Sequence, residues 1–207
     1  AAAQGVWMGN FGGDSTGGWG AHVTPEGKAI YVGYNKTDGN GIRSVRAFDY
    51  LIEDHTDGFQ RGKISTEDVR GPKIEGTALR NGTTSGTWSA AHLGGGSGGW
   101  SGTKQSDTGF FARYAGYYTQ TIDGVTVEVV VNASGKFFFY IRGHTTDSSQ
   151  DDGGYGQFNI DGSFTLTTSK GRTINDGQIN ANGTITGTAS GPTSSPTDGG
   201  VAANGSS

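Results

Sequence analysis

The sequence predicts an all-β protein built from two tandem, related units of short antiparallel strands, with little or no helix. Three observations support this fold class. Glycine accounts for 40 of the 207 residues, which indicates many tight turns, and glycine inside a helix costs about 1 kcal/mol relative to alanine. No long stretch shows a convincing helical periodicity of apolar residues. One block of sequence also occurs twice, at 81–89 and again at 182–190.

The repeated block begins with a turn and continues as a strand. It is Asn-Gly-Thr-Thr-Ser-Gly-Thr-Trp-Ser in the first copy and Asn-Gly-Thr-Ile-Thr-Gly-Thr-Ala-Ser in the second. Asn-Gly favours a tight turn, and β-branched threonine favours a pleated strand. Trp88 and Ala189 occupy the same position in the two copies. At the same spacing, glycines also correspond: Gly76 with Gly177, and Gly98-Gly99 with Gly199-Gly200. Internal repetition of this kind indicates a repeated structural unit.

We assign residues 1–106 to the first β-unit and residues 107–207 to the second, which ends in a tail rich in Gly, Ser and Pro. Short strands separated by regular turn signals are typical of a small barrel or sandwich. Residues 93–102 are expected to be a flexible link or a long hairpin. The tail from residue 191 is expected to be irregular coil, with a short strand at Val201.

Two hairpins are the most clearly marked elements. In the first unit, strands at 19–24 and 29–32 flank a turn that contains Gly27. In the second unit, strands at 125–131 and 136–142 flank the turn Asn-Ala-Ser-Gly. Two extended runs joined by a short glycine-containing turn predict a β-hairpin.

The hairpin of the second unit is unusually apolar. Phe137, Phe138, Phe139 and Tyr140 are consecutive, as are three valines at 129–131. Side chains alternate between the two faces of a strand, so both faces of this hairpin carry bulk. Either the hairpin is covered on both faces inside one molecule, between the two units, or its outer face contacts another copy. The sequence leaves both alternatives open.

Composition excludes several function classes. The formal net charge is −4 without a basic cluster, whereas nucleic acids and anionic membranes require a concentrated positive surface. The chain has no cysteine, so it has neither disulfides nor thiolate metal sites. No apolar run reaches the roughly 18 residues of a membrane-spanning helix. The opening Ala-Ala-Ala-Gln fits either a processed terminus or a trimmed one, and with the lysine-poor composition we expect a bacterial protein that is secreted or held at the cell surface.

The pattern Gly5-Val6-Trp7-Met8-Gly9, and the pair Gly-Thr-Trp-Ser and Gly-Gly-Trp-Ser-Gly within 86–102, are glycine-punctuated motifs around tryptophan. They resemble the repeated β-domains of bacterial secreted and surface proteins, in particular the small eight-stranded barrels of transferrin-binding-protein type. The second unit departs from the pattern, with Ala189 and Val201 where tryptophans would stand. The resemblance implies a surface location and a binding or structural role, and it supplies no catalytic residue.

The sequence gives no catalytic set, and we expect a protein that is not an enzyme. The run Gly-Gly-Ser-Gly-Gly at 95–99 matches a nucleophile elbow only because the segment is glycine-rich, and the strand-to-helix context of that motif is missing. The histidines are His22, His55, His92 and His144. A hydrolase that pairs an acidic residue with His55 is the third function class after the two described below.

We expect no cofactor, and the candidate that the residues suggest is calcium. Two glycine-rich turns carry the hard oxygen ligands that calcium prefers, although neither has the spacing of an EF-hand. The candidate ligands are Asn35, Asp38 and Asn40 in one turn, and Asp147, Asp151 and Asp152 in the other. The alternative is that these side chains only hydrogen-bond their own turns.

The first functional hypothesis is an exported structural or adhesive surface protein that assembles with copies of itself as a filament, residues 1–11 adding a strand to a neighbour. Its predicted interface residues are Val6, Trp7, Met8, Phe11, Phe137, Phe138, Phe139 and Tyr140. The alternative is a β-barrel that binds a carbohydrate or a small apolar molecule. Its pocket would be lined by Trp7, Trp19, Trp88 and Trp100.

Overall fold

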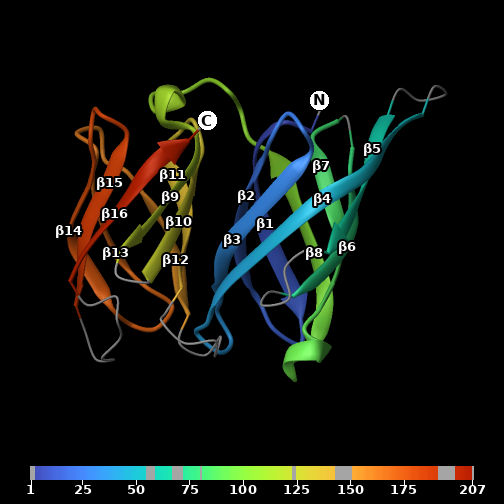
Figure 1. Ribbon diagram of the computed structural model, residues 1–207, viewed down its shortest axis with the longest axis horizontal. Helices are drawn as coiled ribbons and strands as arrows, with labels where there is room; N and C mark the ends of the chain where they lie inside the picture. Colours follow the sequence, from blue (N-terminus) through green and yellow to red (C-terminus); the bar gives the residue numbers. More distant parts are fainter. Residues whose placement is uncertain are drawn as a thin grey trace.

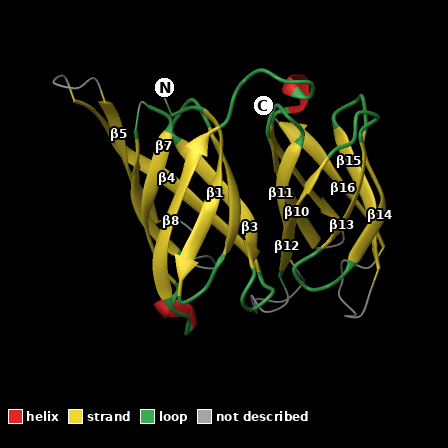
Figure 2. Cartoon of the chain, turned by 180° about the vertical axis from the view of Figure 1, so that it is seen from behind, coloured by secondary structure: helices red, strands yellow, loops and turns green. Residues whose placement is uncertain are grey.

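The computed structural model describes residues 3–54, 59–66, 72–79, 81–122, 125–142, 151–190 and 199–206. The predicted all-β class is confirmed: this part of the chain consists of antiparallel strands and two short 3-10 helices (Figure 1). None of its helices has the length and apolar character needed to cross a lipid bilayer. The strands form two sheets that lie side by side, as Figure 2 shows from behind.

The first sheet is a closed barrel, called the first barrel below. Its strands follow one another in chain order, and β1 closes the barrel by pairing with β8 as well as β2. The strands are β1 (Gly5–Gly13), β2 (Gly17–Val23), β3 (Lys28–Asn35), β4 (Gly41–Asp54), β5 (Phe59–Thr66), β6 (Lys73–Ala78), β7 (Thr83–Ser89) and β8 (Ser97–Lys104). The 3-10 helix η1 (Ala91–Leu93) lies between β7 and β8.

The second sheet has eight strands in the order β12-β11-β10-β9-β16-β15-β14-β13. This is the strand order of the first barrel, opened between its fourth and fifth strands. The strands are β9 (Gly116–Ile122), β10 (Val125–Val131), β11 (Lys136–Arg142), β12 (Asp152–Gln157), β13 (Ser163–Thr167), β14 (Thr173–Ile179), β15 (Thr184–Ser190) and β16 (Gly199–Ser206). The helix η2 (Ala112–Tyr114) lies in the connection between the two sheets. That the two units are related repeats of one unit stays a prediction.

The two clearest sequence signals are confirmed as hairpins, β2 with β3 and β10 with β11. Residues 93–102, expected as a flexible link or a long hairpin, belong to a hairpin: they cover the end of η1 and most of β8, which pairs with β7. The short strand expected at Val201 is found and is longer than expected, because it extends over 199–206 as β16. The coil expected for residues 191–198 lies outside the described part. The tail has little bulk of its own, but β15 and β9 offer backbone partners on its two sides.

Large rings fill the first barrel. Trp7, Trp19, Trp88 and Trp100 are all less than a tenth exposed and belong to one apolar cluster. A Cβ placed on Gly102 would lie only 2.5 Å from the Trp19 ring. Glycines on the barrel wall therefore make room for indoles that a larger side chain would displace.

Phenylalanines and branched aliphatic residues fill the second sheet. Phe137 and Phe139 point into it from β11, and the Phe137 ring stacks on Phe158 with centroids 4.6 Å apart. Aromatic pairs at such separations add to the free energy gained by burial alone. This core and the core of the first barrel form separate apolar clusters.

The outer face of the apolar hairpin packs against the first barrel. A third cluster, which we call the inter-sheet cluster, joins the two sheets and consists of Val6, Met8, Val32, Val130, Phe138 and Tyr140. A Cβ on Gly20 of β2 would lie 3.1 Å from the Phe138 ring, so the sheets approach closely here. Of the two alternatives left open by the sequence, the structure shows coverage inside one molecule.

This arrangement corrects the predicted contact surface between copies. None of the predicted contact residues lies on an open face. The inter-sheet cluster contains Val6, Met8, Phe138 and Tyr140. The core of the first barrel contains Trp7, with Phe11 partly buried against it, and the core of the second sheet contains Phe137 and Phe139. The strand β1 is paired along both of its edges. Closing the barrel therefore uses the backbone edge that strand addition would need. The apolar side chains of β1 are buried on its two faces, in the barrel core and between the sheets.

Candidate functional site

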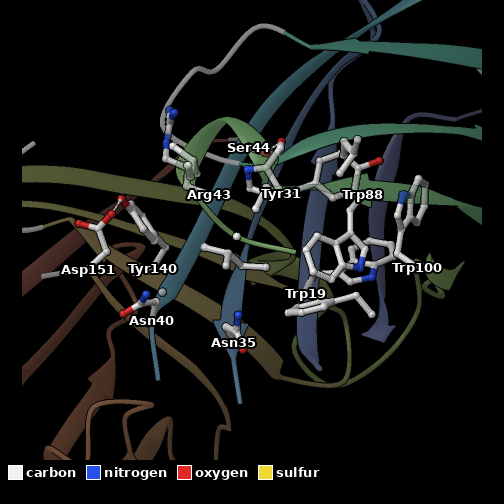
Figure 3. Close-up of a pocket in the computed structure, with 18 of the residues that line it drawn as sticks. Trp19, Tyr31, Asn35, Asn40, Arg43, Ser44, Trp88, Trp100, Tyr140 and Asp151 are labelled. Atoms are coloured by element: carbon white, nitrogen blue, oxygen red, sulfur yellow. Dashed lines mark hydrogen bonds between the residues drawn. The ribbon is translucent and has the colours of Figure 1, made fainter. Parts of the chain in front are cut away.

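A cavity of about 190 Å³ lies at the end of the first barrel that carries η1, since Leu93 of η1 is part of its lining. Figure 3 shows residues that line it. Four parts of the chain line it: strands of the first barrel, the β3–β4 turn with the start of β4, the β7–β8 connection that contains η1, and two residues of the second sheet. The last two are Tyr140 on β11 and Asp151 just before β12. The lining residues are Phe11, Trp19, Tyr31, Asn35, Asp38, Asn40, Gly41, Ile42, Arg43, Ser44, Pro72, Ile74, Trp88, Ala90, Leu93, Gly95, Trp100, Tyr140 and Asp151.

Aromatic rings in mutual contact form one wall of the cavity. Trp19 and Trp100 meet edge to face with centroids 5.7 Å apart, and Tyr31 lies 5.3 Å from Trp19. Phe11 and Trp88 form a second edge-to-face pair at 5.8 Å. These contacts fix the rings, because each is held by its neighbour in a preferred geometry.

The indole N–H groups of this wall are already bonded to the backbone. Trp19 donates to the carbonyl of Asn10 at 3.3 Å, and Trp88 donates to the carbonyl of Gly12 at 2.9 Å. Trp100 donates to the carbonyl of Thr87 at 3.1 Å. With their polar atoms bound to the barrel wall, the indoles offer ring carbons to the cavity.

The β3–β4 turn supplies polar groups at the rim. The Asn35 amide donates to Asp38 at 3.2 Å, and the other Asp38 oxygen accepts from the backbone N–H of Asn40 at 2.8 Å. Farther along β4, the Ser44 hydroxyl donates to the carbonyl of Pro72 at 2.9 Å. This bond joins β4 to the segment just before β6.

The second sheet contributes a hydroxyl–carboxylate pair. The Tyr140 hydroxyl on β11 donates to Asp151 at 2.6 Å, and the two residues are 1% and 2% exposed. Figure 3 shows this pair on one side of the view and the three indoles on the other. The indoles of the cavity thus come from the first barrel and the hydroxyl–carboxylate pair from the second sheet, while the β3–β4 turn of the first barrel adds polar groups at the rim.

Backbone contacts hold the two sheets together beside the cavity. The Gly41 N–H donates to the carbonyl of Asp151 at 3.0 Å. A Cβ on Gly41 would lie 1.9 Å from the carbonyl oxygen of Asp152, so only glycine allows this approach. The Lys170 ammonium also donates to the side-chain oxygen of Asn40. These contacts fix Asp151 at the mouth of the first barrel.

A buried ion pair lies next to the cavity. The Arg43 guanidinium donates to Glu128 on β10, and the Tyr117 hydroxyl donates to the other oxygen of the same carboxylate. Burial, and then the negative charge of Glu128, raise the pKa of the Tyr117 hydroxyl. Tyr117 therefore stays a neutral donor over the physiological range.

The structure places three of the four predicted pocket tryptophans, Trp19, Trp88 and Trp100, in the cavity wall. Trp7 is a core residue instead, and its N–H donates to the carbonyl of Ala3 at 2.8 Å. Tyr31, Ser44 and Arg43 were missed by sequence reasoning. Glu128 was missed too, although one acid within an apolar strand is a signal for a buried partner.

The predicted calcium ligands of the two turns lie near one another. Their oxygen atoms, however, already accept hydrogen bonds from nearby N–H and O–H groups and from the Lys170 ammonium. Three donors bind one oxygen of Asp152, and among the described residues its other oxygen is without a hydrogen bond. Asn40 accepts from Lys170, and Asp147 lies outside the described residues. Within the described ranges no three His, Cys, Asp or Glu residues form a metal-binding group. Calcium binding stays a prediction.

The histidines are not gathered at the cavity as far as the structure describes them. His22 lies at the inter-sheet surface, stacked on Tyr117 with centroids 6.4 Å apart, and burial lowers its pKa. His92 lies in η1. His55 and His144 lie outside the described residues, and so does any site that uses them.

Comparisons with family models, with curated proteins and with solved structures find no match for this chain. The resemblance to β-domains of transferrin-binding-protein type stays a prediction. The function is therefore inferred from the residues of the cavity.

Proposed function

We propose that the protein is a non-enzymatic binding protein whose first barrel holds a small carbohydrate or a small apolar molecule in the aromatic cavity. One observation carries this proposal: three indoles line a cavity while their N–H groups are bonded to backbone carbonyls. Rings fixed in this way offer flat apolar surface, which suits a ligand with an apolar face.

The size of the cavity limits the ligand. The cavity volume is about 190 Å³. Pockets for drug-sized ligands span about 300 to 1,000 Å³. A ligand of one ring fits this volume, whereas a long chain does not.

The hydrogen bonds of the cavity favour binding over catalysis. Asp151 accepts from Tyr140, and Asp38 accepts from Asn35 and Asn40. Histidine is not among the described lining residues. These acids are held by structural partners, an arrangement that orients a ligand without supplying a nucleophile and base pair.

We propose an exported location, in keeping with the glycine-rich, lysine-poor composition. Assembly into filaments takes second place as a candidate function. It relied on an apolar hairpin and on β1, and the hairpin packs against the first barrel while β1 pairs along both edges.

Tryptophan fluorescence tests the proposed function. The full chain is titrated with neutral monosaccharides and with small apolar alcohols, and a saturable change in emission is expected for at least one compound. Trp88→Phe should weaken that binding, because Trp88 lines the cavity. Trp7→Phe is the matched control, a buried tryptophan outside the cavity lining. A panel without a saturable change, or equal losses in both variants, would overturn the proposal.

A further inference from the structure

The cavity has two chemically different sides. The side from the first barrel presents indole carbons, because the N–H groups bond the barrel backbone. The other side carries Tyr140 and Asp151 from the second sheet, with the β3–β4 turn at the rim. A ligand that fits both sides needs one apolar face and an edge of hydrogen-bonding groups.

The charges around the cavity are of both signs. Asp38 and Asp151 are acidic, whereas Arg43 lines the same cavity and Lys170 donates to Asn40 at its rim. The Arg43 guanidinium is already paired with Glu128. The carboxylates of Asp38 and Asp151 already accept hydrogen bonds from protein donors. A charged ligand would compete with these contacts, so the arrangement favours a neutral ligand.

A wholly apolar ligand would fit poorly. It would place a surface without hydrogen-bonding groups against the polar side of the cavity, which carries Asp151 and the rim amides. Polar groups that are covered in this way lose favourable interactions. Hydroxyl groups both donate and accept, so they match a surface that mixes carboxylate, amide and guanidinium groups.

We propose that the cavity is a composite site for one neutral sugar ring, with the ring's apolar face on the indoles and a hydroxyl donating to Asp151. The inference rests on the proposed function and deepens it in two ways. It names the ligand class, and it makes the second sheet part of the binding site.

Two features fit Asp151 for this role. A carboxylate has about four lone-pair sites, so it can accept from Tyr140 and from a ligand hydroxyl together. The backbone of Asp151 is fixed to the barrel mouth by its bond from Gly41, 3.0 Å long. A hydrogen bond to such a pre-positioned charged acceptor is strong and costs little ordering.

Isothermal titration calorimetry on the full chain tests the proposal with four ligand classes: neutral monosaccharides, glucuronate as an anion, choline as a cation, and cyclohexanol as an apolar ring. The variants are Asp151→Asn and Tyr140→Phe. The control is Asp107→Asn, which removes the same charge from an exposed residue of the connection between the sheets. Circular dichroism establishes that each variant is folded.

We expect a neutral monosaccharide to bind more tightly than the other three classes. Asp151→Asn should weaken it about tenfold or more, the loss expected for a hydrogen bond to a charged group. Cyclohexanol should be affected much less, and Asp107→Asn should leave sugar binding unchanged. If Asp151→Asn does not fold, Tyr140→Phe carries the test, because it removes only the hydroxyl that holds the carboxylate.

Three results would overturn the inference in distinguishable ways. Unchanged sugar affinity in both folded variants would remove the second sheet from the site while leaving ligand binding intact. Tighter binding of choline, glucuronate or cyclohexanol than of any neutral sugar would reject the ligand class. Absence of binding by all four classes would reject the proposed function itself.

Discussion

The Nε atom of Arg43, on β4 of the first barrel, donates a hydrogen bond to the Oε1 atom of Glu128, on β10 of the second sheet. Glu128 is 1% exposed, and its other carboxylate oxygen accepts from Tyr117. A charge this deeply buried persists only when it is paired and hydrogen-bonded. Because the partner belongs to the other sheet, the pair links the two sheets energetically.

Glu128→Gln should lower the free energy of unfolding by about 3 kcal/mol. This is the low end of the range for breaking a buried ion pair, because the Arg43 side chain is 25% exposed and regains some solvation. Urea denaturation followed by circular dichroism measures the change. The double change Arg43→Met with Glu128→Met should cost less than the single one, since no buried charge is left unpaired. A single variant as stable as the unchanged protein would contradict the role of the pair.

Gly41→Ala should lower the melting temperature, because the added Cβ would lie 1.9 Å from the carbonyl oxygen of Asp152 and force the sheets apart. Overpacking of this kind costs roughly 1–3 kcal/mol. Differential scanning calorimetry measures the shift. Gly12→Ala is the control, since a Cβ there would meet nothing within 4 Å. Equal melting temperatures for the two variants would show that the contact at Gly41 is looser than described.

Stability should fall at alkaline pH. Burial, and then the neighbouring Tyr114, raise the pKa of the Tyr118 hydroxyl from 10.0 to about 12. When folding raises the pKa of a group, that group contributes its full stabilisation to the folded protein at any pH below its pKa in the unfolded chain. This stabilisation is lost as the pH rises through its pKa in the folded protein. The melting temperature should therefore decrease between pH 10 and about 12. Tyr118→Phe should make the decrease shallower. A variant with the same pH profile as the unchanged chain would argue against this assignment.

Phe138→Asp should strongly destabilise the protein and leave it monomeric where it is folded. Phe138 is 4% exposed within the inter-sheet cluster, so the change replaces buried apolar contacts with a buried charge and costs about 4 kcal/mol or more. Phe110→Asp is the control because Phe110 is 71% exposed. Light scattering and urea denaturation are the measurements. If Phe138→Asp dissociated an oligomer without loss of stability, the hairpin would be a contact between copies.

Local signals predicted much of the fold, because turns and apolar runs act over short distances. The turn Asn-Ala-Ser-Gly puts Gly135 at φ 87°, and the strands on its two sides end where the sequence predicted. A short strand was predicted at Val201, but the full length of β16 was harder to predict, because it depends on backbone pairing with β15 and β9.

The cavity was predictable only in part. Tryptophans suggested an aromatic pocket, and three of them line it. That Asp151 would join them depends on how the second sheet packs on β4, which no local pattern encodes. Glu128 was missed although it is an acid among valines, and the sequence could not single out its partner Arg43, 85 residues away, among the available cations.

The central claim is that the first barrel covers the outer face of the apolar hairpin within one molecule, which brings the two sides of the cavity together. Because the chain has one methionine, methyl labelling gives a single NMR signal, from Met8, whose sulfur lies 3.6 Å from the side-chain nitrogen of Asn132. We predict nuclear Overhauser effects from this methyl group to the Asn132 amide protons and the Phe138 ring that persist on dilution of a monomer. Absence of these effects, or their appearance only between differently labelled molecules, would contradict the claim.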